Sequence, residues 1–443
     1  MKHLIISALL ASATLTGSAQ NPATDNATHY TPAAENLKAR QDFSDSRFGI
    51  FLHWGLYSMF AQGEWYLNYG PDKDEYAKAV DAFYPHSFDA AKWISAIKAS
   101  GARYICFTTR HHEGFSMWDT KQSDYNIMHT PYGKDIVRQL ADECHKQDVR
   151  LHLYYSHIDW TREDYPAGRT GLTTGKDPKK ADWPHYYKFM NAQLTELLTQ
   201  YGKVDGIWFD GWWDHDEDSI PFNWQLPEQY RLIHSLQPAC IIGNNHHQTP
   251  FEGEDMQMFE RDIPGENKSG LSGQSISQLP LETCQTMNGM WGYKIKDQDY
   301  KSTKDLIRLL VRTAAKGANL LLNIGPQPNG ELPATALDRL KGIGEWLNGK
   351  AGESIYATVS GGVTAGDSVV TTMGKGRKAP LYIHVLTDKA MPQISLPLEK
   401  KPRRATNLTT GSSVKMHKKG KDVVFSPTDM KDNETDYIIK VEF

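Results

Sequence analysis

The sequence predicts an α/β fold, a (β/α)8-like TIM barrel followed by a C-terminal antiparallel β-sandwich, because two patterns divide the chain. From residue 47 onward, short apolar runs rich in β-forming residues alternate with segments that carry apolar residues at helical spacing. Such alternation is typical of a parallel sheet whose strands are joined by helices. After Gly352 the pattern changes to short alternating runs separated by turns. The 12 tryptophans follow the same division, since all of them lie between Trp54 and Trp346.

The barrel elements follow in chain order. Strands are predicted at residues 48–54, 104–108, 151–156, 204–209, 241–243 and 320–324. Helices are predicted at residues 90–99, 136–146, 186–198, 228–236, 306–315 and 334–346. Six or more such units favour a closed barrel over an open sheet. An open sheet that binds a dinucleotide would also carry a glycine-rich turn after its first strand, and this chain has none.

The C-terminal segment has the texture of a β-sandwich. Short strands are predicted at residues 355–359, 369–372, 381–385, 394–396, 423–425 and 437–441. We therefore predict a catalytic barrel over residues 20–352 and a sandwich over residues 353–443.

The N-terminus resembles a signal peptide. Lys2 precedes the apolar run 4–10, and small residues lead to Ala19, so residues 1–19 are predicted to be removed on export to the periplasm or the medium. No cysteine follows, which argues against a lipoprotein anchor. The four cysteines are too few for a disulfide scaffold, and Cys106 and Cys240 lie in apolar runs where buried free thiols are expected.

Composition excludes two classes of partner. A net charge of -4 gives no basic face for nucleic acid, because binding a polyanion depends on releasing its counterions to Lys and Arg. Beyond the N-terminus no apolar run is long enough to span a membrane. The oligomeric state is not indicated by the sequence.

Polar and aromatic residues follow four successive strands. In parallel barrels the active site lies at the C-terminal ends of the strands, and these exits read His53-Trp54, Arg110 to Glu113, Tyr154 to Ser156 and Asp210 to Trp213. Aromatic faces stack on sugar C–H surfaces, imidazoles and phenols bind hydroxyls, and a carboxylate supplies chemistry. Asp210 ends an apolar strand, which favours a rigidly held nucleophile over the alternative of a helix cap.

Several collinear segments then identify a resemblance. They are Phe48 to Gly55, Glu64 to Tyr66, His111 to Phe115, Tyr154 to Ser156, Trp208 to Asp210, Trp291 to Tyr293 and Asn323 to Pro326. Together they resemble the retaining α-L-fucosidases of glycoside hydrolase family 29, and the signal pattern fits a bacterial, exported member. The resemblance implies hydrolysis of terminal α-L-fucosyl residues of a fucosylated oligosaccharide or glycoconjugate, without a cofactor, on a barrel followed by a β-sandwich.

The resemblance also implies roles for single residues. Asp210 falls on the nucleophile, and Trp291 is expected near the sugar methyl group. The positions that would hold the fucose hydroxyls and its apolar face are His53, Glu64, Trp65, His111, His112 and Tyr154.

The acid/base is less directly indicated. The glutamates after the nucleophile are Glu252, Glu254, Glu260, Glu266 and Glu282. Glu260 is predicted, because it stands five residues after Asp255 as in a family stretch, and Glu282 is the second choice. The acid is expected in a drier or more negative setting than the nucleophile, whose charge nearby histidines would stabilise.

The sequence departs from the family before the acid. Residues 244–247 read Asn-Asn-His-His where an Arg-Trp is expected, and Arg261 or His247 is predicted to replace the missing cation. Linkage preference is expected to depend on the loops 161–182 and 252–279, and the insert 169–180 is predicted to be a mobile rim loop.

The same residues are compatible with three other functions. A zinc site at His53 and His111 to Glu113 is disfavoured, because adjacent strand residues point in opposite directions and no H-E-x-x-H spacing is present, so no metal is predicted. A carbohydrate-binding protein without activity and a barrel glycosidase acting on a galacto-configured sugar are separated from a fucosidase by assays on aryl fucoside and aryl galactoside.

Overall fold

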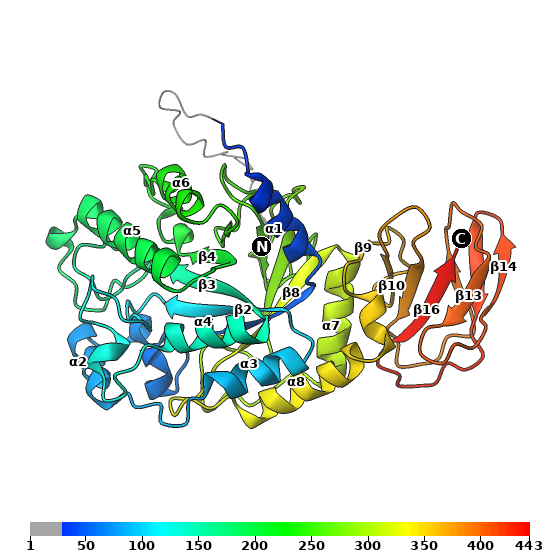
Figure 1. Cartoon of the computed structure of the whole chain (residues 1–443), viewed down its shortest axis with the longest axis horizontal. Coiled ribbons are helices and arrows are strands. Elements are labelled where there is room, and N and C mark those ends of the chain that lie inside the picture. Colours follow the sequence, from blue (N-terminus) through cyan, green and yellow to red (C-terminus); the bar gives the residue numbers. More distant parts are fainter. Residues whose placement is uncertain (1–28) are drawn as a thin grey trace, which may run out of the picture.

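The computed structural model describes residues 29–443, so the predicted signal peptide 1–19 lies outside the described residues. A barrel formed by the first part of the chain stands beside a smaller β domain formed by the last part, with α7 between the barrel sheet and that domain (Figure 1). The predicted fold class is confirmed.

The barrel contains eight parallel strands. In chain order they are β1 (Phe48–Leu52), β2 (Tyr104–Arg110), β3 (Arg150–Ser156), β4 (Gly206–Asp210), β5 (Ile241–Asn244), β6 (Gln257–Glu260), β7 (Leu281–Thr286) and β8 (Ala318–Ile324). Their order in the sheet is β5-β4-β3-β2-β1-β8-β7-β6, so β5 and β6 are neighbours around the barrel without a shared ladder. We call this junction the seam.

The six predicted helices are all present, with small shifts at their ends. They are α3 (Ala90–Ala99), α4 (Ile136–Gln147), α5 (Trp183–Gln200), α6 (Leu226–Leu236), α7 (Thr303–Ala315) and α8 (Ala334–Leu347). Aspartates begin three of them, since the side chains of Asp89, Asp135 and Asp182 accept hydrogen bonds from first-turn amides. Within residues 29–443 no α-helix follows β5 or β6, so the barrel is eight-stranded but lacks two of its helices.

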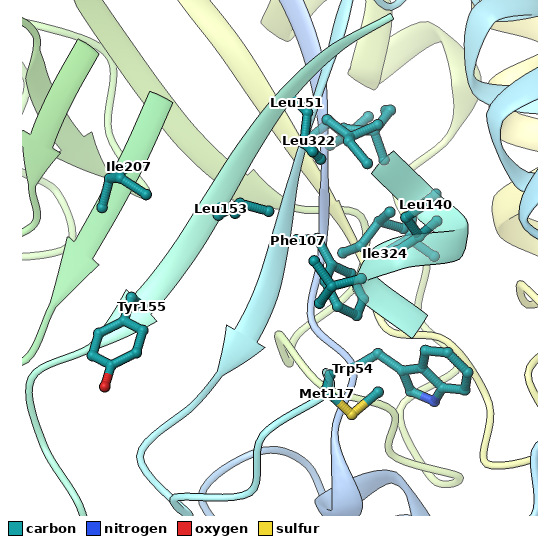
Figure 2. Packing of buried hydrophobic residues seen from close by; sticks show 14 of the residues in the cluster. Trp54, Phe107, Met117, Leu140, Leu151, Leu153, Tyr155, Ile207, Leu322 and Ile324 are labelled. Carbon is teal, nitrogen blue, oxygen red and sulfur yellow. The ribbon is translucent and has the colours of Figure 1, made fainter. Parts of the chain in front are cut away.

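Alternation along each strand divides the barrel into two layers. On β3, Leu151, Leu153 and Tyr155 pack in the outer layer between strands and helices, which also includes Leu140 of α4 (Figure 2). Tyr154 instead faces the barrel interior, where it joins a separate buried cluster. Because strand residues alternate in direction, one residue of each pair is committed to the core and the other is available at the barrel mouth.

Near the N-terminal ends of β5 and β6, Asp255 bridges the seam. Its Oδ2 accepts the Ile242 amide of β5 at 2.8 Å, and its backbone N–H donates to the Ile242 carbonyl at 2.7 Å. Its Oδ1 pairs with Arg40 at 2.6 Å. Arg40 comes from α1 (Ala34–Ser44), a helix that the sequence did not reveal because its apolar residues show no helical periodicity.

The C-terminal part forms two antiparallel sheets. The first holds β13 (Arg404–Asn407), β16 (Tyr437–Glu442), β11 (Leu381–Val385), β10 (Val369–Met373) and β9 (Val359–Ser360), and the second holds β12 (Ile394–Leu396), β15 (Asp422–Ser426) and β14 (Lys415–Lys419). The predicted strand 355–359 was wrong, because these residues mostly form a turn after a 3-10 helix and only Val359 enters β9. β13 and β14 were missed.

Arg308 of α7 connects the barrel to the second domain. Its guanidinium donates to the backbone carbonyls of Thr387, Glu434 and Thr435 at 2.9–3.0 Å and pairs with Asp388 at 2.9 Å. These acceptors all belong to loops of the sandwich. Arg308, a buried cation of the barrel, therefore fixes the sandwich loops against α7.

The four cysteines are buried and free, as expected for Cys106 and Cys240. Among the described residues, no helix has both the length and the apolar character needed to cross a bilayer.

Candidate active site

A cavity of about 210 Å³ opens at the C-terminal ends of the barrel strands. Seven of the predicted site residues line it: His53, Trp65, His111, His112, Asp210, Glu260 and Trp291. Further residues complete the wall, namely Phe51, Arg169, Trp208, Trp213, Asn245, His247, Leu271 and Cys284. The strand exits therefore converge as predicted.

The two histidines that follow β2 both line the cavity. The register between β2 and β3 shifts at Thr108 and Arg110, and Arg110 points outward to form a buried ion pair with Asp159. The chain then leaves the strand, and the rings of His111 and His112 lie 4.2 Å apart, both against the cavity. The expectation that the two rings point in opposite directions was wrong, because it assumed a regular strand beyond Arg110.

The hydrogen-bond network fixes the tautomers of two histidines. Asn323 donates through Nδ2 to the Trp291 carbonyl at 2.7 Å, so its Oδ1 accepts from Nδ1 of His53 at 2.6 Å. Ser156 donates to the Ile158 carbonyl at 2.9 Å, so its Oγ accepts from Nδ1 of His112 at 2.6 Å. In both rings Nε2 is left as an acceptor.

Burial keeps these imidazoles neutral. It lowers the pKa of His53 and of His112 to about 3 and lowers the pKa of His111 well below its ordinary value. The cavity therefore presents neutral ring nitrogens, which suit the hydroxyl groups of a sugar.

Asp210 is held at the end of β4 by donors from its own following turn and from β3. Its Oδ1 accepts Nε1 of Trp213 at 2.9 Å, and its Oδ2 accepts the Tyr154 hydroxyl at 3.0 Å. Trp213 returns to the carboxylate because Gly211 adopts φ +106, where a Cβ would also approach Ile158 to 2.6 Å. The helix that follows has no side-chain cap, so the alternative of a capping role for Asp210 is not supported.

Glu260 lies across the cavity from Asp210, at the end of β6. Nδ2 of Asn245 is 2.9 Å from Oε2 of Glu260 and 3.4 Å from Oδ1 of Asp210. One amide nitrogen therefore contacts both carboxyls, which face each other in one cavity as the catalytic pair of a glycosidase does.

The two carboxyls differ in acidity, but in the opposite sense to the expectation. Burial, and then the charge of Glu260, raises the pKa of Asp210 to about 6. Burial would also raise the pKa of Glu260, yet hydrogen bonds from His247 and Asn245 outweigh it and lower that pKa. Trp213, His247 and Tyr154 lower the pKa of Asp210, but burial and the charge of Glu260 outweigh them.

Glu282 does not reach the cavity. It projects from β7 into the barrel interior, 1% exposed, where Tyr104 and Trp208 donate to its two oxygens at 2.6 and 2.8 Å. Burial raises its pKa to about 7. The geometry thus favours the first choice, Glu260, over the second.

Two predicted contact residues lie just behind the cavity wall. Tyr154 reaches the site through its bond to Asp210. Glu64 is 2% exposed and accepts the Gly292 amide at 2.7 Å, which fixes the segment that carries Trp291. Burial raises the pKa of Glu64.

The rim insert is tied down rather than free. Asp214 accepts hydrogen bonds from the Tyr165 hydroxyl, the Gly168 amide and both the amide and hydroxyl of Thr170, at 2.7–3.1 Å. Arg169 is thereby placed on the cavity wall. The predicted rim position is correct, but these bonds argue against a loose loop.

Sequence reasoning missed Trp213 and Asn245 as partners of Asp210. The signal for Trp213 was the Asp-Gly pair before it, which predicts a tight reversal. No comparable signal existed for Asn245, because its role depends on the seam. In the part of the chain that the structure describes, no three His, Cys, Asp or Glu residues are grouped as a metal site.

Comparison with known families gives one match that spans the barrel. A family model described as alpha-L-fucosidase matches residues 17–352. A putative α-L-fucosidase of Caenorhabditis elegans is 32% identical over 359 residues, which cover 74% of this chain and 70% of that protein. An α-L-fucosidase of Dictyostelium discoideum is 29% identical and covers 74% of each chain.

Solved structures resemble the whole fold. An α-L-fucosidase isoenzyme from Paenibacillus thiaminolyticus has a TM-score of 0.80 and 32% identity, covering 92% of this chain and 99% of that one. An α-L-fucosidase from Bacteroides thetaiotaomicron, trapped as a covalent intermediate with 2-fluoro-fucosyl fluoride, has a TM-score of 0.77 and 26% identity. It covers 91% of this chain and 95% of its own.

Proposed function

The chain belongs to the α-L-fucosidase family, glycoside hydrolase family 29, and on this premise we propose that Asp210 and Glu260 perform its chemistry. It is a retaining α-L-fucosidase, which hydrolyses terminal α-L-fucosyl residues by double displacement through a fucosyl-enzyme intermediate. The observation that carries the assignment is the pair of carboxyls in one cavity, both contacted by Asn245.

In the first step Asp210 attacks the anomeric carbon. Oδ2 accepts one hydrogen bond, from the Tyr154 hydroxyl, whereas Oδ1 accepts bonds from the Trp213 ring and from the Gly211 amide. Oδ2 therefore has more lone-pair density available and is assigned as the attacking oxygen. As the new C–O bond forms, the glycosidic C–O bond breaks and the proton of Glu260 passes to the leaving oxygen. The products are a fucosyl-Asp210 ester, ionised Glu260 and the free aglycone.

In the second step ionised Glu260 takes a proton from water. The resulting hydroxide attacks the anomeric carbon from the side the aglycone left, and the bond to Asp210 breaks. Two inversions give net retention, and Glu260 is again protonated for the next cycle.

The remaining cavity residues recognise the sugar. Nε2 of His53 and of His112 is an acceptor, so these rings are assigned to sugar hydroxyl donors together with His111. Trp65 and Trp291 provide apolar faces, and Trp291 is assigned to the methyl group that distinguishes fucose from galactose. Glu64 supports the Trp291 segment from behind.

The nucleophile is tested by replacement and chemical rescue. Asp210→Gly is expected to lose nearly all turnover on an aryl α-L-fucoside and to regain it with azide, as a fucosyl azide of inverted configuration. Asp210→Ala that keeps more than a small fraction of turnover would rule out the assignment.

Slow cleavage of an aryl galactoside by the wild-type enzyme, relative to the aryl fucoside, is expected from the methyl-binding wall.

The acid/base is tested by comparing Glu260→Ala with Glu282→Gln. Azide is expected to restore turnover by Glu260→Ala and to yield a fucosyl azide of retained configuration, because the small anion occupies the place of the missing base. The same product from a Glu282 variant, and not from Glu260→Ala, would transfer the role to Glu282.

We further propose that residues 20–352 form the catalytic domain of a bacterial, exported enzyme. The support is the family match over the barrel and the charged, apolar and small-residue order of residues 1–19. Mass spectrometry of the chain from its native host is expected to find Gln20 at the N-terminus in the periplasm or medium. Intact Met1 in the cytosol would contradict export.

A further inference from the structure

At the C-terminal ends of β5 and β6, side-chain contacts bridge the seam in place of backbone hydrogen bonds. β5 and β6 share no ladder, and at the cavity Asn245 and His247, just after β5, both contact Oε2 of Glu260 at the end of β6. The distances are 2.9 Å from Nδ2 of Asn245 and 3.0 Å from Nε2 of His247. The position of the Glu260 carboxyl therefore depends on these two residues.

The backbone of His247 is held in an unfavourable conformation. Its φ is +61, in the left-handed region that residues other than glycine seldom adopt. Such strain persists where surrounding structure requires it, and it concentrates at functional sites. Here the strained conformation brings the ring onto the cavity wall, beside Glu260.

Arg261, the other candidate for the missing family cation, and the neighbouring His246 contact other partners. Nε2 of His246 lies 3.0 Å from both oxygens of Glu254, behind the cavity wall. Arg261 donates to the Gly289 carbonyl at 3.1 Å, and its guanidinium lies 4.9 Å from the centre of the Trp291 ring. Of the two residues predicted to replace the cation, His247 is the one that contacts the Glu260 carboxyl.

We propose that His247 is a positioning residue of the reaction, whose Nε2–H holds the Glu260 carboxyl against the leaving oxygen through both steps. The inference rests on the proposed role of Glu260 as acid/base. Ionised Glu260 can only accept hydrogen bonds, so the shared proton at this contact belongs to His247. Oε2 stays bound to His247 and Asn245, which leaves Oε1 to deliver and recover the transferred proton.

The charged and titratable groups near the pair come from several elements. They are His53 after β1, Glu64 on the loop beyond it, Tyr154 on β3, Asp210 on β4, Asp216 on the following loop, Arg261 after β6 and Cys284 on β7. A hydrogen bond to ionised Glu260 favours its charged form. Loss of that bond is therefore expected to move the acidic limb of the activity profile to higher pH.

Two substitutions separate the hydrogen bond from the bulk of the ring. His247→Phe keeps a ring but has no donor, whereas His247→Gln keeps an N–H that can reach the same oxygen. Both are compared on a fucosyl disaccharide, whose leaving group needs protonation, and on a dinitrophenyl fucoside, whose leaving group does not. His246→Gln is the matched control, because that histidine binds a glutamate outside the cavity.

His247→Phe is expected to lower kcat/KM, which reports the first step alone, by about 10- to 100-fold on the disaccharide, part of the roughly 10²–10⁴-fold that general acid catalysis supplies. On the dinitrophenyl fucoside the loss is expected to be about threefold or less. His247→Gln is expected to recover most of the disaccharide activity and the wild-type acidic limb. His246→Gln is expected to show no dependence on the leaving group.

The proposal is overturned if His247→Phe slows both substrates equally, slows neither, or leaves the acidic limb in place. It is also overturned if His247→Gln behaves like His247→Phe. Glu260→Ala, measured on the same two substrates, distinguishes the two levels of the argument. If Glu260→Ala itself shows no dependence on the leaving group, the acid/base assignment fails, and the role of His247 fails with it.

Discussion

The Tyr154 hydroxyl donates a hydrogen bond to Oδ2 of Asp210 at 3.0 Å, from the strand adjacent to the one that carries the aspartate. The next residue, Tyr155, faces the opposite side of the barrel wall and donates to Gln193 at 2.7 Å. Two successive tyrosines thus serve the site and the outer core.

Tyr154→Phe is expected to lower kcat/KM at pH 5 by about 10- to 100-fold. Removing a hydrogen bond to a charged group costs about 1.5–3 kcal/mol. It also raises the pKa of Asp210 further above about 6, so less of the nucleophile is ionised. The measurement is kcat/KM against pH. Tyr155→Phe is the control, and equal effects of the two substitutions on the profile would contradict the assignment.

The wild-type enzyme is expected to have a bell-shaped kcat/KM profile with its maximum at mildly acid pH. The productive state of the pair carries one proton, and its limbs belong to the pair as a whole. The pKa of Glu260 is lowered and that of Asp210 is about 6, so activity should rise through the lower value and fall through the upper one. A maximum above pH 7 on an aryl fucoside would contradict these directions.

Glu282→Gln is expected to keep turnover and to change how stability depends on pH. Burial raises the pKa of Glu282 to about 7 from an ordinary value of 4.5. The folded state therefore binds this proton more tightly than the unfolded state does. Its contribution to the free energy of unfolding is complete below pH 4.5 and is lost as the pH rises through about 7.

The loss amounts to about 3 kcal/mol, at about 1.4 kcal/mol for each pKa unit. Glutamine cannot ionise, so the variant should gain most of that amount relative to wild type between pH 5 and pH 7.5. Denaturant unfolding at several pH values measures the difference. Parallel curves for the two proteins would show that Glu282 does not retain its proton.

Arg308→Ala is expected to destabilise the protein by about 2–5 kcal/mol, because several backbone carbonyls lose a charged donor. The kcat/KM should stay near wild type, since Arg308 is remote from the cavity. Thermal unfolding followed with activity measures both. Lys304→Ala is the control: Lys304 pairs with the exposed Asp388, so its loss should cost about 1 kcal/mol or less.

Chelation is expected to leave the activity unchanged. Positioned carboxyls suffice for the proposed chemistry, and the cavity histidines are assigned to hydroxyl groups. The measurement is turnover before and after dialysis against EDTA. Lost activity that zinc restores would favour the metal alternative.

The sequence predicted the strands and helices that have strong periodicity. α3 and β12 were placed to the residue, because their apolar spacing and turn residues agree with the fold. β6 and β7 were missed, since Gln257–Glu260 and Leu281–Thr286 mix polar and apolar residues without a clean alternation. Their polar residues serve the barrel interior, where Glu282 is satisfied by partners that are distant in the sequence.

The sequence predicted which residues form the site, but not the pKa shifts of its two carboxyls. Each strand exit could be read locally, and the residues do meet in one cavity. The acidity of Asp210 and Glu260 depends instead on partners from other strands, such as Asn245 and His247. The direction of His111 and His112 depended on where β2 ends, at Arg110, which a pattern of residue types does not reveal.

The seam between β5 and β6 also bears on how the enzyme could be diversified. A strand with a ladder on one side only can gain or lose a residue at its exit without disturbing a neighbour's register. The acid/base and its partners stand at such exits, whereas Asp210 stands on β4, which is paired on both sides. Changes in length beyond His247, whose contact with Glu260 must be kept, should therefore be tolerated better than changes after β4. The loops that follow the seam are thus suitable targets for directed evolution of new leaving-group preferences.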